Sequence, residues 1–124
     1  MKKAFLLIAI LMFCVSPIWA EYTQTCKVKY KKQYDEWSDY YRVDVHFLTG
    51  SELNTKTKSF NYSSYDVYAV VFWSKDQATV MKLSGYMGCG SEVDENCINN
   101  KYSNLEGTDQ EGRSWEICTK SNCY

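Results

Sequence analysis

The sequence predicts a mainly β protein, either a small antiparallel barrel or a sandwich of about six strands, stabilised by disulfides and with room for one short helix. Two observations predict this fold class. Apolar and polar residues alternate with a period of two in several short segments, as they do in strands that have one buried face. Glycines and polar residues interrupt these segments at close intervals, which is typical of turns between short strands.

Residues 1–20 have the layout of a secretory signal peptide. Lys2 and Lys3 precede an apolar run over residues 4–15, and a helix-breaking proline and the small residue Ala20 follow it. A helix of about twelve residues spans about 18 Å, which is less than the roughly 30 Å of hydrocarbon in a bilayer. We therefore predict cleavage after Ala20 rather than a membrane anchor.

Cleavage at this point leaves a single β-rich domain, residues 21–124, that is periplasmic or secreted. Its length suits one compact domain and not two, and we expect no membrane span in it. Lipidation of Cys14 is the alternative to simple cleavage. It is disfavoured because Phe13 stands where a lipoprotein signal has a small residue.

The charge of the mature chain argues against a nucleic-acid partner. The whole chain has 14 basic and 15 acidic residues. Cleavage removes Lys2 and Lys3 but no acidic residue, so the net charge of the mature chain is about −3. Affinity for a phosphate backbone depends on a cationic surface. A cationic protein partner suits this charge better, because complementary charge raises the rate of encounter.

The first three expected strands are the clearest. In residues 26–30 a cysteine, a valine and a tyrosine share one face, and lysines occupy the other. Residues 41–47 repeat this alternation, and the Thr-Gly-Ser sequence at residues 49–51 indicates a turn. Residues 67–73, VYAVVFW, are apolar on both faces and form the expected central strand.

The second half of the domain is expected to add three more strands. A hairpin loop leads into the first of them, residues 78–83. Residues 84–101 have weak periodicity, with room for a short helix near their end. Residues 102–107 and 113–118 are the last two expected strands, and Gly112 in the turn between them can take the positive φ that closes many hairpins.

Five cysteines remain after cleavage, and in an oxidising compartment the default is disulfide formation. We pair Cys89 with Cys97, because they enclose a polar segment without apolar periodicity. We pair Cys26 with Cys118, because a closed sheet brings the first and last strands side by side. Cys123 is then the free thiol, with Cys118–Cys123 as the competing pair.

No cofactor or metal is expected. The cysteine intervals lack the paired knuckles of structural zinc, and the oxygen-rich loops at residues 94–96 and 109–112 do not match the ligand spacing of an EF-hand. His46, the single histidine, shares a strand face with Asp44, but no nucleophile stands in a recognisable triad context. We therefore expect a protein that is not an enzyme.

Aromatic residues are too numerous for a core of this size. The chain has 11 tyrosines and 4 tryptophans, and each large ring buries roughly 150–250 Å². In the run YDEWSDYY, strand parity places Trp37 and Tyr41 in the core. The candidate binding residues are the tyrosines and carboxylates left outside, with the tyrosines that lead into the central strand: Tyr34, Asp35, Glu36, Asp39, Tyr40, Tyr62, Tyr65 and Tyr68.

The expected function is recognition of another protein in the bacterial envelope, in the manner of an inhibitor, an immunity protein or an accessory subunit. Exposed tyrosines and tryptophans are typical of such interfaces. Two alternatives remain open. Tyrosines that stack on sugar rings would make the chain a glycan or peptidoglycan binder, and two carboxylates that converge in a cleft would make it a small hydrolase.

Overall fold

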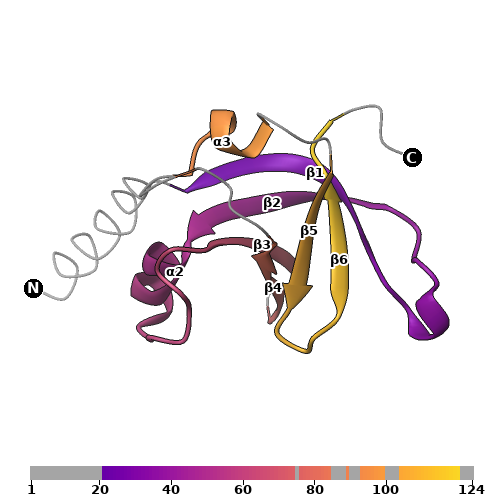
Figure 1. Cartoon of the computed structure of the whole chain (residues 1–124), viewed down its shortest axis with the longest axis horizontal. Coiled ribbons are helices and arrows are strands. Elements are labelled where there is room, and N and C mark those ends of the chain that lie inside the picture. The colour runs from indigo at the N-terminus through magenta and orange to yellow at the C-terminus, as the bar shows by residue number, and fades with distance from the viewer. Residues whose placement is uncertain (1–20, 75, 85–88, 90–92, 100–103, 121–124) are drawn as a thin grey trace, which may run out of the picture.

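The computed structural model describes residues 21–74, 76–84, 89, 93–99 and 104–120. Within them, six antiparallel strands form a closed barrel, in which each strand pairs with the next in sequence and the last pairs with the first (Figure 1). The predicted fold class is confirmed, in its barrel form. The strands are β1 (Tyr22–Tyr30), β2 (Tyr41–Thr49), β3 (Val67–Ser74), β4 (Gln77–Leu83), β5 (Asn104–Asp109) and β6 (Ser114–Cys118).

Pairing of β1 with β6 closes the barrel. The register places Val28 opposite Ile117, and both side chains are fully buried. The N–H of Lys31 extends the pairing by donating to the carbonyl of Ser114 at 2.9 Å. Backbone hydrogen bonds and core packing therefore hold this seam.

β3 is buried on both faces over its first part, as predicted for the central strand. Its inward residues, such as Ala69 and Val71, belong to the core inside the barrel. Its outward residues, Tyr68 and Val70, form a second, smaller core with Leu53 of the helix α2 (Gly50–Thr57). This helix covers the outer face of β3 and explains why the strand is apolar on both sides.

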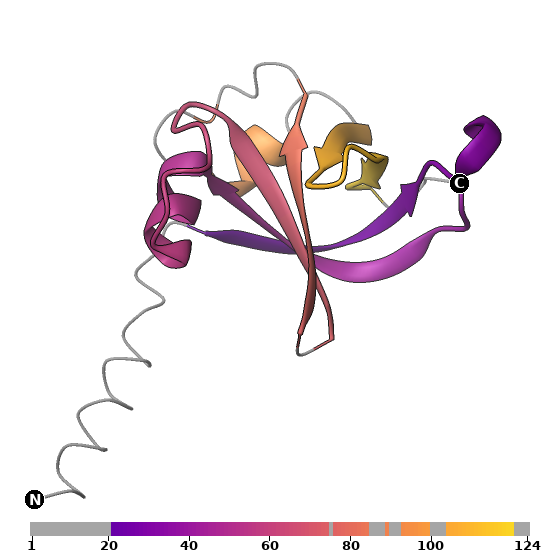
Figure 2. The ribbon, with the colours of Figure 1, turned by 90° about the horizontal axis from the view of Figure 1, so that it is seen from below.

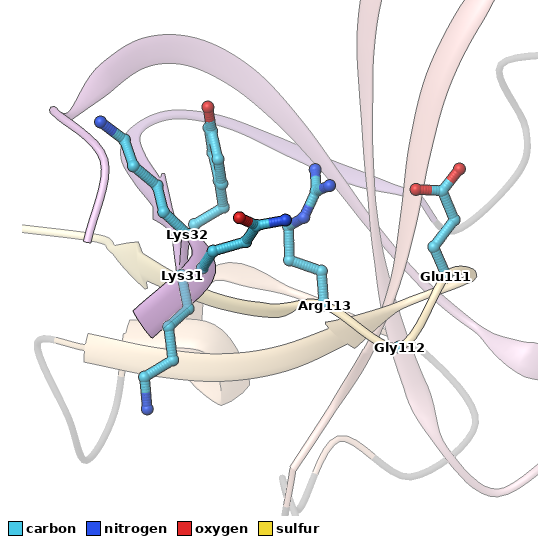
Figure 3. A pocket seen from close by; sticks show the side chains of 7 residues that line it. Lys31, Lys32, Glu111, Gly112 and Arg113 are labelled. Atoms are coloured by element: carbon cyan, nitrogen blue, oxygen red, sulfur yellow. The ribbon is translucent and has the colours of Figure 1, made fainter. Parts of the chain in front are cut away.

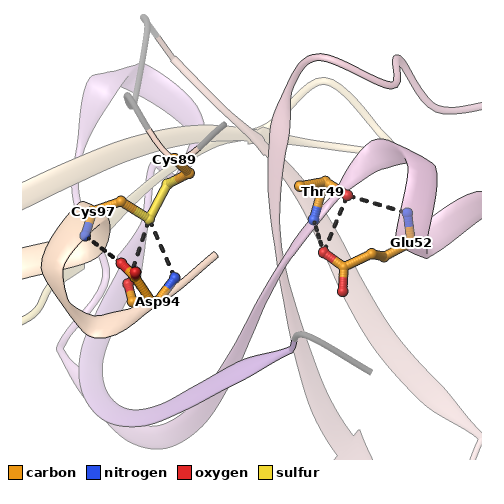
Figure 4. The surroundings of a disulfide bond; sticks show 5 residues. All are labelled: Thr49, Glu52, Cys89, Asp94 and Cys97. Atoms are coloured by element: carbon orange, nitrogen blue, oxygen red, sulfur yellow. Dashed lines mark hydrogen bonds between the residues drawn. A yellow bond between two sulfur atoms is a disulfide. The ribbon is translucent and has the colours of Figure 1, made fainter. Parts of the chain in front are cut away.

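The helix α2 stands where the sequence predicts only a turn. It begins with a capping box (Figure 4), in which the N–H of Glu52 donates to Thr49 Oγ1 at 3.2 Å and the N–H of Thr49 donates to Glu52 Oε1 at 3.1 Å. Gly50 is required by close approach, because a Cβ there would lie 1.7 Å from the carbonyl oxygen of Ser63.

Two smaller predictions are confirmed. A short helix, α3 (Glu95–Asn99), lies near the end of the segment with weak periodicity, and Gly112 in the β5–β6 turn has a φ of 82°. The remaining regular element among the described residues is the 3-10 helix η2 (Gln33–Asp35) between β1 and β2. No helix in the described part of the chain is long and apolar enough to span a membrane.

The Cys89–Cys97 disulfide is present, as predicted (Figure 4). The carboxylate of Asp94 accepts a hydrogen bond from the N–H of Cys97 at 2.9 Å. Both cysteines pack against the core inside the barrel, to which Val93 and Ile98 also belong. The crosslink thus fastens the segment that contains α3 to the barrel.

The predicted Cys26–Cys118 disulfide is wrong. The first and last strands are neighbours, as expected, but Cys118 lies opposite Lys27 and not opposite Cys26. Because side chains alternate between the two faces of a strand, Cys26 points into the core and Cys118 points to the other face. Cys26 is a buried free thiol, and Cys118 forms a disulfide whose partner is outside the described residues. Cys123, the predicted free thiol, also lies outside them.

We predict that Cys26 resists thiol reagents in the native protein. Its side chain is buried, and burial raises the pKa of the thiol to about 12, so the reactive thiolate is scarce near neutral pH. Alkylation followed by peptide mapping should label Cys26 only in denaturant. Cys26→Val, which fills the same site without a thiol, should melt near the wild-type temperature. Rapid labelling of Cys26 under native conditions would contradict its place in the core.

Candidate binding surface at the hairpin end of the barrel

The two ends of the barrel differ. One end, called the hairpin end here, carries the β1–β2 connection (residues 31–40), the β3–β4 turn and the β5–β6 turn. The opposite end carries α2, α3 and the Cys89–Cys97 disulfide (Figures 1 and 2). Most of the exposed large rings lie at the hairpin end.

Four aromatic rings from four strands meet at the hairpin end, and we call them the ring cluster. The ring of Tyr30 stacks on that of Tyr41 with centroids 6.3 Å apart and lies 5.2 Å from that of Trp115. Trp73 completes the circuit, with its ring 5.8 Å from Tyr41 and 5.9 Å from Trp115. Trp115 is buried, whereas Tyr41 is 41% and Trp73 37% exposed. The cluster covers the core at this end and presents two rings to solvent.

Asp109 anchors the ring cluster through Trp115. Its Oδ2 accepts a hydrogen bond from the indole Nε1 of Trp115 at 2.8 Å, and its Oδ1 accepts from the backbone N–H groups of Glu111 and Arg113 at 2.9 Å. Burial alone would raise the pKa of Asp109, but these bonds outweigh it and hold the pKa below its usual value. Asp109 is therefore suited to a structural role and not to that of a general acid, which needs a raised pKa.

The β1–β2 connection, residues 31–40, extends from the barrel as an arm (Figure 1). Buried Ser38 ties the base of the arm: its N–H donates to the carbonyl of Tyr30 at 2.8 Å, and its Oγ accepts from the N–H of Tyr30 at 3.0 Å. Further out, Lys31 and Trp37 form an isolated β-bridge. These backbone contacts give the arm a defined conformation.

The tip of the arm holds Tyr34 in solvent with an unfavourable backbone conformation. Tyr34 and Asp35 both have a φ of 62°, in the left-handed region that residues with a Cβ rarely adopt. The side chain of Tyr34 is 93% exposed, so burial does not compensate for this conformation. Backbone strain of this kind clusters at functional sites.

The predicted placement of Trp37 and Tyr41 in the core is wrong. The left-handed residues at the tip interrupt the strand alternation, and Trp37 comes to lie outside, 39% exposed. There the Nζ of Lys29 lies 5.0 Å from the ring of Trp37 and 4.8 Å from that of Tyr40, and it also pairs with Glu116 at 3.4 Å. Tyr41 belongs to the ring cluster instead.

A recess of about 450 Å³ lies between the base of the arm and the β5–β6 turn (Figure 3). Tyr30 and residues 31–33 line one side of it, and residues 111–113 line the other. The Cζ of Arg113 lies 5.1 Å from the centre of the Tyr30 ring. A second recess of about 320 Å³ shares Arg113 with the first and is bordered by Trp73. Rings and charges of both signs therefore meet here.

The predicted binding residues divide between the two ends of the barrel. Five lie on the arm, four of them exposed and the last half-buried: Tyr34, Asp35, Glu36, Asp39 and Tyr40. Tyr62 and Tyr65 lie on the loop between α2 and β3, near the opposite end. Tyr68 is buried, and its hydroxyl accepts from the N–H of Ser63 at 3.0 Å. Its prediction as a surface residue is therefore wrong, because α2 covers it.

The sequence does not predict that Trp73, Arg113 and the buried Trp115 meet at this end of the barrel. Strand parity shows which face a side chain occupies, but it does not show where rings from different strands meet. A usable signal was present. Trp73 is next to one expected hairpin turn and Arg113 and Trp115 follow another, and alternate turns of an up-and-down barrel lie at the same end.

His46 does not pair with Asp44. The Nδ1 of His46 lies 2.5 Å from Glu21 Oε1, and Glu21 also contacts Lys56, while Asp44 accepts from the hydroxyl of Thr25 at 2.7 Å. Burial would raise the pKa of Glu21, but hydrogen bonds from Lys56 and His46 hold it below its usual value. No group of three or more metal-ligating side chains occurs in the described ranges.

Comparison of the chain with protein-family models, curated proteins and solved structures found no match. Function is therefore inferred from the residues of the molecule alone. The hairpin end combines exposed rings, charges of both signs and two recesses, and these features are typical of a recognition surface.

We predict that Asp109→Asn lowers the free energy of unfolding at pH 7 by about 1–3 kcal/mol, because an amide cannot accept the bond from Trp115 together with those from the backbone. The pKa of Asp109 is lowered by folding. Its contribution is therefore present above the unfolded pKa of about 3.9 and lost as the pH falls through the folded pKa. Urea unfolding between pH 7 and pH 3 should show the two proteins converging in acid.

The matched control is Asp76→Asn, which changes an exposed carboxylate at the same end of the barrel. It should alter stability by less than about 0.5 kcal/mol. A stability difference between Asp109→Asn and wild type that stays constant across this pH range would contradict the anchoring role of the carboxylate.

Proposed function

We propose that this chain is an exported binding protein that recognises another protein through the hairpin end of its barrel. The contact surface consists of the arm and the two solvent-facing rings of the ring cluster. Export to the periplasm or the medium is part of the proposal, and it is supported by the signal-peptide layout of residues 1–20.

The observation that carries the proposal is the presentation of Tyr34. Its left-handed backbone costs roughly 1–2 kcal/mol, and its ring, 93% exposed, gains nothing from burial within the chain. The base of the arm is already secured by Ser38. A partner that covers Tyr34 buries up to roughly 150–250 Å² of ring surface, and tyrosines in such positions dominate the energetics of protein interfaces.

The three carboxylates of the arm outnumber its two lysines, Lys31 and Lys32, and this favours a partner with a cationic contact surface. Asp35, Glu36 and Asp39 are all exposed. Within the part of the chain that the structure describes, Asp35 alone of the three has an ion pair, with Lys31 at 3.7 Å. Complementary charge on the partner would raise the association rate more than the affinity, and it would make binding sensitive to salt.

A glycan is the second candidate ligand, and the recess of about 320 Å³ favours it, because the partly exposed ring of Trp73 at its border could stack on a sugar. Against it, the polar groups of Asp109 and Gln110 in the same wall already bond within the chain. A soluble oligosaccharide that binds would raise the melting temperature, which the protein-partner proposal does not predict. Hydrolysis is favoured least, because its general acid needs a raised pKa and the pKa of Asp109 is lowered.

We predict that Tyr34→Gly abolishes partner capture without weakening the fold. Glycine adopts the left-handed conformation freely, so the melting temperature should stay unchanged or rise, even as the contact ring is lost. The measurement is affinity capture from the envelope and secreted fractions of the source cells with immobilised wild-type and variant protein, accompanied by thermal unfolding of both.

Tyr65→Ala is the matched control. Tyr65 is 95% exposed, but it lies on the loop between α2 and β3 and not on the arm. Capture should be unaffected by this change. A partner that Tyr34→Gly still captures, or that Tyr65→Ala loses to the same degree, would contradict recognition through the arm.

A further inference from the structure

One edge of β2 is unpaired along half of its length. Pairing between β2 and β3 stops at His46↔Val70, so residues 41–45 have no strand partner on that side among the described residues. On the other side the same stretch pairs continuously with β1. Figure 2 shows the β1–β2 ribbon and the β3–β4 hairpin turning away from each other beyond this point.

The backbone groups of Arg42 and Asp44 point toward the missing strand. In the ladder with β3, the N–H of Gly50 donates to the carbonyl of Asp66 at 2.9 Å. In an antiparallel sheet, alternate residues direct both N–H and C=O to the same side. Steps of two residues back from Gly50 lead to Asp44 and Arg42, so each presents a donor and an acceptor at this edge. Both residues are exposed.

The two charged side chains along this edge, Arg42 and Asp44, have no oppositely charged residue opposite them on β1. Arg42 lies opposite Lys27 of β1, a like-charge pair that is unfavourable in a sheet. Arg42 has no ion pair within the described part of the chain. Asp44 lies opposite Thr25 and has only its hydroxyl as a side-chain partner there. Between the two charges, Val43 turns inward and packs against the core.

The end of β3 forms the facing wall of this opening. The register of β3 with β4 shifts between Phe72 and Ser74, and bulges of this kind redirect side chains beside binding sites. Phe72 is 63% exposed, and Trp73 contributes a partly exposed ring. An extended chain lying along β2 would therefore have apolar surface on its other side.

We propose that this edge binds an extended segment of a protein partner, which adds to β2 as an antiparallel strand. Only a polypeptide backbone supplies alternating N–H and C=O groups that match a strand edge. Charge complementarity specifies the segment: a basic residue opposite Asp44, an acidic residue opposite Arg42, and apolar residues at the alternating positions. The inference rests on the proposed function in taking the partner to be a protein, but it does not depend on Tyr34.

The test uses a blocked synthetic peptide with the core Val-Lys-Val-Glu-Val, which in antiparallel register sets its lysine against Asp44 and its glutamate against Arg42. Titration followed by amide NMR should shift signals of residues 41–45 and of Phe72. A peptide with the two charges exchanged, Val-Glu-Val-Lys-Val, should bind about tenfold more weakly, because both cross-strand pairs become repulsive.

The double variant Arg42→Glu with Asp44→Lys should reverse this preference. Both positions are exposed, and the first change places an acidic residue opposite Lys27. The fold should therefore be retained, and a melting temperature close to that of the wild type is the check. Tyr34→Gly should leave peptide affinity unchanged. Failure of partner capture through the arm and failure of strand addition are thereby measured separately.

Three outcomes would overturn the proposal. The peptide at millimolar concentration leaves residues 41–45 unshifted, or the two peptides bind equally well, or the chain alone self-associates through this edge on concentration. The last outcome would identify a second copy of the chain as the occupant instead of a partner segment.

Discussion

Closure of a barrel by strands of unequal length is the constraint on which the other features depend. β1 and β2 have 9 residues each, whereas β5 has 6 and β6 has 5. A closed ladder needs only the stretch that all strands share, and the longer strands extend beyond it. The part of β1 that extends beyond β6, residues 22–26, pairs with β2 alone among the described strands, at the end of the barrel away from the arm. At the other end β3 runs on to Ser74 but diverges from β2 after Val70, and this divergence leaves one edge of β2 without a strand beside it.

Where the ladder ends, side chains have to cover the core. At the end that carries α3, the Cys89–Cys97 disulfide and the buried residues Val93 and Ile98 serve this purpose. At the hairpin end the ring cluster does so, with Trp115 fixed by Asp109. Because aromatic rings cover the core at this end, some of these rings remain in contact with solvent. The same residues that complete the core therefore form part of the proposed binding surface.

Local patterns predict a small antiparallel barrel or sandwich, the central strand and the Cys89–Cys97 disulfide, because each depends on neighbours that are close in sequence. The helix α2 was missed although Thr49 and Glu52 have the spacing of a capping box, since the glycine between them indicated a turn. Tyr68 was misplaced for a related reason. A strand that is apolar on both faces requires a cover for each, and α2 is the cover that was not predicted.

Other features depend on long-range geometry or on rare backbone conformations. To decide whether Cys26 can pair with Cys118, the register between β1 and β6 must be known to within one residue. Turn signals in the sequence do not define the register that closely. The left-handed conformations at Tyr34 and Asp35 could not be predicted, because neither residue is a glycine. These two conformations interrupt the strand and place Trp37 outside the core. The ring cluster joins four strands, so no single segment contains its pattern.

Amide hydrogen exchange, measured residue by residue, tests the closed but divergent barrel most directly. Closure of β1 on β6 and separation of β2 from β3 predict slow exchange at Lys29 and Glu116 in the seam and at His46 in the ladder, with rapid exchange at Arg42 and Asp44. Equally slow exchange at His46, Arg42 and Asp44 would mean that β2 and β3 pair along their whole length. Rapid exchange at Lys29 and Glu116 would mean that the barrel is not closed.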